Sequence, residues 1–140
     1  MILPTITIYR GLPGSGKSTA AERAGHEIIL EADQFFVVDG EYRHDPQKQR
    51  DAQDYCLAMA RFWLYRGRDI AVANTFVRQS DIDDYIWIAR KYGATVKVVK
   101  CSGDYGSIHG VPDSKIARMR LMWERVRIPP DVDGEEHGRA

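Results

Sequence analysis

Residues 5–19 read TITIYRGLPGSGKST, and this stretch decides the fold of the chain. Residues 5–9 are all β-branched or aromatic, a composition typical of a β-strand. Residues 11–18 match the pattern G-x-x-x-x-G-K-[S/T] at every fixed position, and residues 19–23 continue as a predicted helix. A strand, a glycine-rich turn and a helix in this order predict a loop that binds phosphate groups.

Phosphate chemistry explains why the loop has these residue types at this spacing. Glycine allows backbone conformations that other residues avoid, so successive N–H groups can point at one anion, and the start of the following helix adds its dipole. Lys17 is expected to reach the β- and γ-phosphates, and the Ser18 hydroxyl to be an oxygen ligand of Mg²⁺. We therefore expect a nucleoside triphosphate to be bound by Pro13, Gly14, Ser15, Gly16, Lys17, Ser18 and Thr19.

The chain has 140 residues, enough for one domain with a core but not for two. We expect a folded domain over residues 1–128 and a disordered tail over residues 129–140, because residues 131–140 contain one valine and no other large apolar residue. Lys and Arg together number 20, as do Asp and Glu. This balance excludes an overall basic field for nucleic acid, so any such contact needs a local patch.

The cysteines and the hydropathy of the chain bear on its compartment. Cys56 lies in an apolar helical pattern and Cys101 at the end of a strand, so we expect two buried free thiols rather than a disulfide. No signal peptide is seen, and no apolar run approaches the roughly 18 residues that a membrane span needs. We expect a cytoplasmic protein with no membrane partner, and its oligomeric state is left open.

Further along the chain, predicted strands and helices alternate. Apolar runs predict strands over residues 27–31, 69–73 and 95–99, and three- and four-residue spacings predict helices over 45–66, 80–92 and from residue 113 or 114. Asp45 and Ser80 are expected to cap the first two of these helices. This alternation predicts an α/β fold with a parallel sheet. Inward-facing side chains of the first and last of these helices are expected to be Ala52, Tyr55, Cys56, Met59, Phe62 and Trp63, and Ile116, Met119, Met122 and Trp123.

Asp33 follows the second predicted strand, at the carboxyl end where the ligand sites of open α/β sheets collect. A kinase needs a carboxylate in such a place, to orient the attacking hydroxyl and accept its proton. Asp33 fits that role; the alternative is a turn or capping aspartate before Phe35 and Phe36. Glu31, two residues earlier on the same strand face, is the other carboxylate that could matter.

Several stretches together resemble a known family. They are GLPGSGKST, EADQFF at residues 31–36, DGEY at residues 39–42 and HGVP at residues 109–112, followed by Ile116, Arg118-Met119 and Trp123-Glu124. Over residues 4–126 the chain is similar to the small P-loop kinase-type ATPases. These include the kinase module of phage polynucleotide kinase and the ATP-binding domain of NEDD4-binding-protein-2-like proteins.

The resemblance implies a three-layer P-loop NTPase fold of the kinase type, with about four parallel strands, helices on both faces and a C-terminal lid helix. It further implies ATP with Mg²⁺, and phosphoryl transfer to a 5′-hydroxyl or a similar alcohol. On this resemblance Lys17 and Ser18 hold the phosphates and the metal, and Asp33 is the general base. Arg118 matches the family's Ile-x-Arg-Met and is a candidate for the lid arginine that contacts the nucleotide.

Three positions depart from the family pattern. Relatives often carry an aspartate at the end of the third strand, where this chain reads Ala73-Asn74-Thr75-Phe76. The lid at residues 102–108 has no arginine, and Phe36 replaces the arginine that phage polynucleotide kinases place three residues after the base. Two functions therefore remain open. One is an ATP-dependent kinase acting on a nucleoside, a nucleic-acid 5′ end or another small alcohol; the other is a nucleotide-binding regulatory or host-interacting protein with little or no transfer activity.

Overall fold

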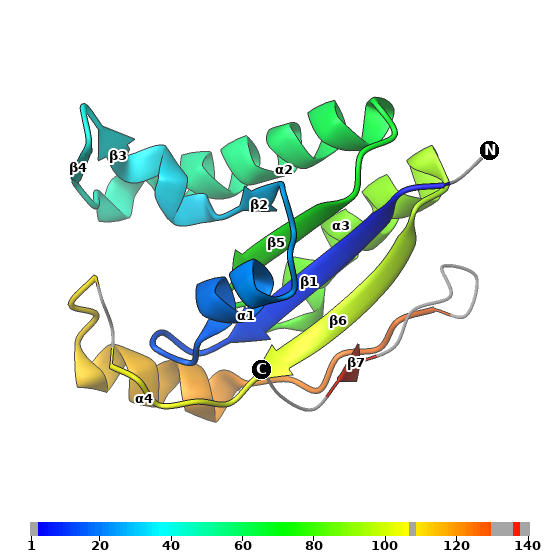
Figure 1. The fold of residues 1–140 in the computed structure, drawn as a ribbon. Helices are drawn as coiled ribbons and strands as arrows, with labels where there is room; N and C mark the ends of the chain where they lie inside the picture. The colour runs from blue at the N-terminus through cyan, green and yellow to red at the C-terminus, as the bar shows by residue number, and fades with distance from the viewer. Residues whose placement is uncertain (1–2, 107–108, 130–135, 138–140) are drawn as a thin grey trace.

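The computed structural model describes residues 3–106, 109–129 and 136–137, and a parallel sheet forms its centre (Figure 1). The strand order is β2-β5-β1-β6-β7, with every neighbouring pair parallel. The four-stranded parallel sheet expected from the sequence is confirmed, although the second strand is shorter than the expected residues 27–31. The strands are β1 (Thr5–Gly11), β2 (Ile29–Leu30), β5 (Ile70–Asn74), β6 (Thr95–Cys101) and β7 (Glu136–His137).

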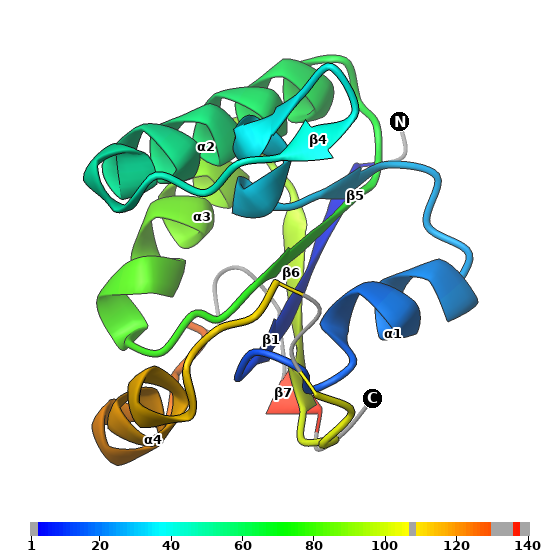
Figure 2. The same cartoon turned by 90° about the vertical axis from the view of Figure 1, so that its left-hand side faces the viewer.

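Helices cover both faces of the sheet, which gives the three layers expected of this fold. Figure 2 shows α2 (Gln49–Tyr65) and α3 (Gln79–Tyr92) on one side of the sheet and α1 (Lys17–Arg23) on the other. Helix α4 (Asp113–Met122) lies beyond the carboxyl ends of the strands (Figure 1). Short elements complete the described chain: the 3₁₀ helices η1 (Ala32–Phe36) and η2 (Pro46–Lys48), and a hairpin of β3 (Val37–Val38) and β4 (Glu41–Tyr42).

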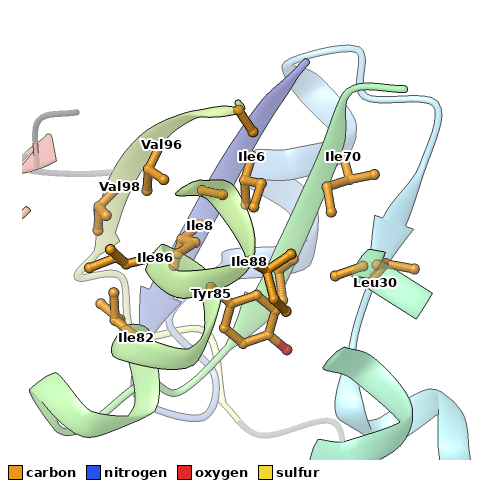
Figure 3. Packing of buried hydrophobic residues seen from close by; sticks show 14 of the residues in the cluster. Ile6, Ile8, Leu30, Ile70, Ile82, Tyr85, Ile86, Ile88, Val96 and Val98 are labelled. Atoms are coloured by element: carbon orange, nitrogen blue, oxygen red, sulfur yellow. The ribbon is translucent and has the colours of Figure 1, made fainter. Parts of the chain in front are cut away.

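Alternation along the strands divides the core between the two faces. Ile6 and Ile8 of β1 belong to the larger cluster, where α3 contributes Ile82, Tyr85, Ile86 and Ile88 (Figure 3). Tyr9, on the opposite face, joins the smaller cluster beneath α1. The strands are thus covered on both sides, which explains their almost continuous apolar runs.

The buried face of helix α2 differs in detail from the expectation. The buried residues of α2 are Ala52, Cys56, Ala60 and Leu64, a ridge of residues four apart in which the first three are small. Phe62, expected to face inward, is instead 42% exposed, with the Arg66 guanidinium 3.5 Å above its ring. The expectation failed because small alanines let the helix approach the sheet along the other ridge, which turns Phe62 outward.

One of the two predicted N-cap residues is confirmed, and the other is wrong. Asp45 caps η2, which leads into α2, by accepting a hydrogen bond from the Gln47 N–H at 3.0 Å. Helix α3 begins at Gln79, one residue before the expected start, so Ser80 is not the cap. Arg78 is the N-cap, and the Asp81 carboxylate accepts from its N–H at 2.9 Å. The side-chain hydrogen bond at the start of α3 therefore comes from Asp81 and satisfies the N–H of the N-cap residue itself, which is a different bond from the one expected of Ser80.

The remaining expectations on burial have mixed outcomes. Cys56 and Cys101 are buried free thiols, as expected. In α4 no residue is fully buried, and Met122, expected to face inward, is 38% exposed, because the helix lies at the edge of the fold rather than over the sheet. Most of the predicted disordered tail lies outside the described residues, which include Glu136–His137 as a strand beside β6. Among the helices that the structure describes, none has the length and apolar character to cross a membrane.

Candidate functional site

The loop between β1 and α1 has the conformation that phosphate binding requires. Gly14 and Gly16 adopt positive φ angles of 80° and 93°. A Cβ at Gly14 would lie 2.6 Å from the Gly106 carbonyl oxygen, so a side chain is excluded by contact as well as by backbone angle. Helix α1 then starts with no side-chain cap. Its first N–H groups are therefore left for an anion.

A second loop supports the first from outside. The Tyr105 N–H donates to the Gly14 carbonyl at 2.8 Å, and the Gly103 N–H donates to the Ser15 carbonyl at 3.2 Å. Ser15 is buried, and its hydroxyl has no hydrogen-bond partner among the described residues. These contacts hold carbonyl groups of the loop away from the ligand side, so that the loop is shaped before any nucleotide arrives.

Lys17 lies at the centre of the charged groups of the site. Its ammonium group donates to the Leu12 carbonyl at 3.0 Å. Burial lowers the pKa of Lys17, while the nearby Cys101, Glu31 and Asp33 act to raise that pKa. The lysine is therefore close enough to interact electrostatically with both carboxylates at the end of β2.

Ser18 is joined directly to Glu31, whose carboxylate accepts a hydrogen bond from the Ser18 hydroxyl at 2.6 Å. The end of β5 positions that carboxylate, because the Asn74 side-chain oxygen accepts from the Ala32 N–H at 2.9 Å. Asn74 also donates to the Cys56 sulfur at 3.6 Å. Hydroxyl and carboxylate oxygens are hard donors that Mg²⁺ prefers, so Ser18 and Glu31 fit that ion.

Asp33 is held between the side chains of Tyr42, on the nearby strand β4, and of His109, from a distant segment. The Tyr42 hydroxyl donates to one carboxylate oxygen at 3.1 Å, and His109 Nε2 lies 3.5 Å from the other. The two rings stack on each other with centroids 4.0 Å apart. Burial and the neighbouring Asp33 raise the pKa of Tyr42 to about 12, so its hydroxyl is a proton donor at neutral pH. Sequence reasoning did not connect these residues, although Tyr42 and His109 both lie in motifs that carried the family resemblance.

A cleft of about 680 Å³ brings most of the expected site together. Asp33 lines it, as does every expected loop residue except the buried Ser15. Lys115 and Met119 of α4 also line it. Arg118 is exposed and is not among the described residues that line the cleft, so its contact with nucleotide stays a prediction. The lining residues that were expected are Pro13, Gly14, Gly16, Lys17, Ser18, Thr19 and Asp33.

Arg10 is a structurally important residue that sequence reasoning missed. It is 0% exposed and donates hydrogen bonds to the Phe76 carbonyl at 2.7 Å and to the Glu124 carbonyl at 2.8 Å. Its guanidinium lies 4.0 Å from the centre of the Trp123 ring. Arg10 thus joins the end of β1 to the loop after β5 and to the segment after α4. The available signal was a charged residue inside an otherwise apolar strand.

The loop, its uncapped helix and the order of the parallel strands define the class of protein: this is a P-loop fold of the kinase type. The sequence model of the AAA domain family matches residues 6–106, more than half of the chain, so the chain belongs to this family. The family resemblance recognised in the sequence is thereby confirmed.

Individual relatives agree with this class. The chain is 27% identical to human NEDD4-binding protein 2 over 141 residues, which cover 89% of this chain but only 8% of that protein. Kti12 of Chaetomium thermophilum, in complex with ADP-AlF3, superposes with a TM-score of 0.71 at 14% identity, covering 96% of this chain and 88% of that one. A gluconokinase from Sinorhizobium meliloti 1021 has a TM-score of 0.56 at 20% identity, covering 100% and 85%. At these identities the two structures support the fold alone.

Proposed function

We propose that this protein is an ATP-dependent phosphotransferase that moves the γ-phosphoryl group of ATP to a hydroxyl acceptor, with Asp33 as the general base. One observation carries the proposal: the P-loop lysine and Asp33 line the same cleft. A phosphate-binding loop alone would fit any nucleotide-binding protein. A carboxylate across the same cleft adds the group that an attacking hydroxyl needs.

The residues of the cleft have separate tasks in this reaction. The first N–H groups of α1 bind the phosphates, and Lys17 exchanges the Leu12 carbonyl for the terminal phosphoryl group. Bound Mg²⁺ would supply positive charge to the β- and γ-phosphates. The acceptor oxygen bonds to the γ-phosphorus as the bond to the leaving ADP oxygen breaks, and Asp33 takes the acceptor proton. In this structure the Tyr42 hydroxyl donates a hydrogen bond to Asp33, and the acceptor hydroxyl would donate the same kind of bond.

The charge of the cleft favours an uncharged or cationic alcohol as acceptor. Beyond the P-loop the lining includes the carboxylates of Asp33, Asp81 and Asp84, with Lys115 as the nearby cation on α4. A chain of phosphates would be repelled there. A nucleoside fits better, because the stacked Tyr42 and His109 rings offer an aromatic surface. Transfer to a free nucleoside should change little with added salt, whereas transfer to a nucleic-acid end would weaken steeply.

The second candidate function is a nucleotide-binding regulator, or a protein that binds a host partner, with little or no transfer. Two observations favour it. Ala73 stands where a carboxylate would support the metal, and the described part of the lid, residues 102–106, contains no arginine. An arginine that stabilises the transferring phosphoryl group is worth about 10³-fold or more in rate. The two candidates differ in whether label moves from ATP.

Incubation with γ-labelled ATP and a panel of nucleosides, sugars and oligonucleotides tests the proposal. In Asp33→Asn we expect transfer to fall by roughly 10²- to 10⁴-fold, the range for loss of a general base, with ATP affinity retained. Asp83→Asn is the matched control, because it removes the same charge from an exposed site on α3 outside the cleft. ATP binding with neither transfer nor hydrolysis by the wild-type protein would instead support the regulator.

A further inference from the structure

The end of β5 lacks the carboxylate that a magnesium site beside a P-loop needs. In P-loop NTPases the ion is held by the P-loop hydroxyl together with a carboxylate from a neighbouring strand. Here β5, the strand that pairs with β1 on this side, ends in Ala73 and Asn74. Ala73 is buried and apolar, and both polar atoms of the Asn74 side chain already have partners in Ala32 and Cys56. Neither residue can supply negative charge.

The next strand along the sheet supplies a carboxylate in the right place. Glu31 follows β2, which pairs with β5 on its far side, and its carboxylate accepts a hydrogen bond from the Ser18 hydroxyl at 2.6 Å. This length is that of a charge-assisted O–H···O⁻ hydrogen bond. A hydroxyl has one proton and two lone pairs. Because its hydrogen points at Glu31, the Ser18 oxygen keeps its lone pairs for a cation.

Asp33 has other partners and is not the carboxylate that contacts Ser18. Its two carboxylate oxygens face Tyr42 and His109, whereas the carboxylate of Glu31 is hydrogen-bonded to Ser18 itself. Both carboxylates also raise the pKa of Lys17. Two acidic residues that are two positions apart in sequence therefore have different neighbours and separate uses.

We propose that Glu31 is the carboxylate of the magnesium site, and that it replaces at the end of β2 the acidic group that is absent from the end of β5. Glu31 is a positioning residue: it accepts the hydrogen bond of the Ser18 hydroxyl, leaves the Ser18 lone pairs for Mg²⁺ and would supply negative charge to the ion. The inference rests on the proposed nucleotide site, but it does not depend on the identity of the acceptor.

Calorimetric titration of ATP against Glu31→Gln, with Mg²⁺ and with EDTA, tests the assignment. We expect the affinity of the nucleotide complex for Mg²⁺ to fall about 10- to 100-fold, the usual cost of losing a group that orients a metal ligand. Without metal, the same variant should bind ATP as well as or better than wild type, because a negative charge has left the neighbourhood of the phosphates. A purely structural role for Glu31 would weaken both titrations together.

Asp33→Asn is the matched control, because it removes the same charge two residues away without touching the Ser18 bond. It should keep the Mg²⁺ affinity and lose transfer. Mn²⁺ paramagnetic resonance gives a second readout, since free and bound ion are counted directly. Glu31→Asp keeps the charge but shortens the side chain, and an intermediate loss of Mn²⁺ affinity is expected even if Glu31→Gln folds poorly.

The outcomes separate the inference from the function beneath it. Equal Mg²⁺ affinity in wild type, Glu31→Gln and Glu31→Asp would overturn the role of Glu31, while loss of transfer in Asp33→Asn would leave the phosphotransferase standing. Failure of the wild-type protein to bind ATP with or without Mg²⁺ would overturn both. A metal-dependent loss confined to the Glu31 variants supports the assignment.

Discussion

The P-loop and helix α4 line the same cleft, but they are held in place by different means. The P-loop is fixed by backbone: positive φ angles at Gly14 and Gly16, and hydrogen bonds from the loop at residues 103–106. Helix α4 has no buried residue, and it contributes only Lys115 and Met119 to the described lining of the cleft. Its firm attachment lies after its end, where the Glu124 carbonyl accepts from Arg10.

This difference suggests how the two walls divide the work. A wall made of backbone is already shaped for phosphate and need not reorganise when nucleotide binds. A helix without a buried face can change position without exposing core residues, as long as its anchor holds. Polar contacts strengthen that anchor, because Glu124 also accepts from the Gln79 N–H at 2.8 Å and donates its own N–H to the Val77 carbonyl at 2.9 Å.

The largest expected effect comes from cutting the anchor. Arg10→Met keeps much of the side-chain volume but leaves the buried Phe76 carbonyl and the Glu124 carbonyl without their charged donor. Loss of such bonds should lower the free energy of unfolding by about 3 kcal/mol. Chemical denaturation measures this loss, and limited proteolysis should show earlier cleavage in α4 than in the P-loop.

Arg120→Met is the control for that experiment. Arg120 is an exposed residue of α4, so its loss should change stability by less than about 0.5 kcal/mol. Equal stability of the two variants would mean that the Arg10 contacts do not anchor the helix.

The next largest effect tests the conformation of the P-loop backbone. Gly14→Ala places a Cβ at φ +80°, 2.6 Å from the Gly106 carbonyl oxygen. The left-handed conformation costs a non-glycine residue about 1–2 kcal/mol, and the contact pushes the supporting loop away. We expect nucleotide affinity to fall by roughly 10- to 100-fold, measured by calorimetry.

Gly25→Ala is a matched control for this backbone strain. Gly25 has a similar φ of +83°, but a Cβ there would meet nothing within 4 Å. It should lower the melting temperature modestly and leave nucleotide affinity unchanged. If both variants bound nucleotide equally well, the close approach of the two loops would have no role in the site.

The division between the two walls also explains how much could be predicted from the sequence. The P-loop, the parallel sheet and the place of Asp33 follow from local patterns, since glycine spacing and strand alternation act over a few neighbouring residues. The contact of Tyr42 and His109 with Asp33 depends on how the β3–β4 hairpin folds back and on where the distant segment around His109 lies. The periodicity of the sequence carries no information about such a contact.

Side-chain choices between equivalent faces were also beyond the sequence. Phe62 and Leu64 fit an apolar helix pattern equally well, and the packing of the alanine ridge of α2 decided that Leu64 is buried and Phe62 is not. The bond from Ser18 to Glu31 was missed for a similar reason, because both Glu31 and Asp33 were expected on one strand face. The turn into η1 at Ala32 gives the two carboxylates different neighbours.

The smallest expected effect is a pH dependence of nucleotide affinity, which comes from Lys17 at the end of the P-loop. Burial holds the pKa of Lys17 below its ordinary 10.5, and bound phosphates should raise it again. Nucleotide affinity should therefore decline, by less than about tenfold per pH unit, as pH rises through the lowered pKa and the free protein loses this charge. Lys17→Arg keeps its charge over the whole range, so its affinity should be flat where that of wild type falls.

The same lysine should give the opposite trend in the protein without nucleotide. Its folded pKa lies below that of the unfolded chain, so between the two values the unfolded state binds more protons and the stability contributed by this group rises with pH. The difference in unfolding free energy between wild type and Lys17→Met, followed over pH, isolates the contribution of this group. Trends of equal sign in affinity and stability would contradict a buried, phosphate-binding lysine. An affinity that falls with pH while stability rises with pH would mean that burial of the Lys17 charge lowers stability and that this charge binds the phosphates.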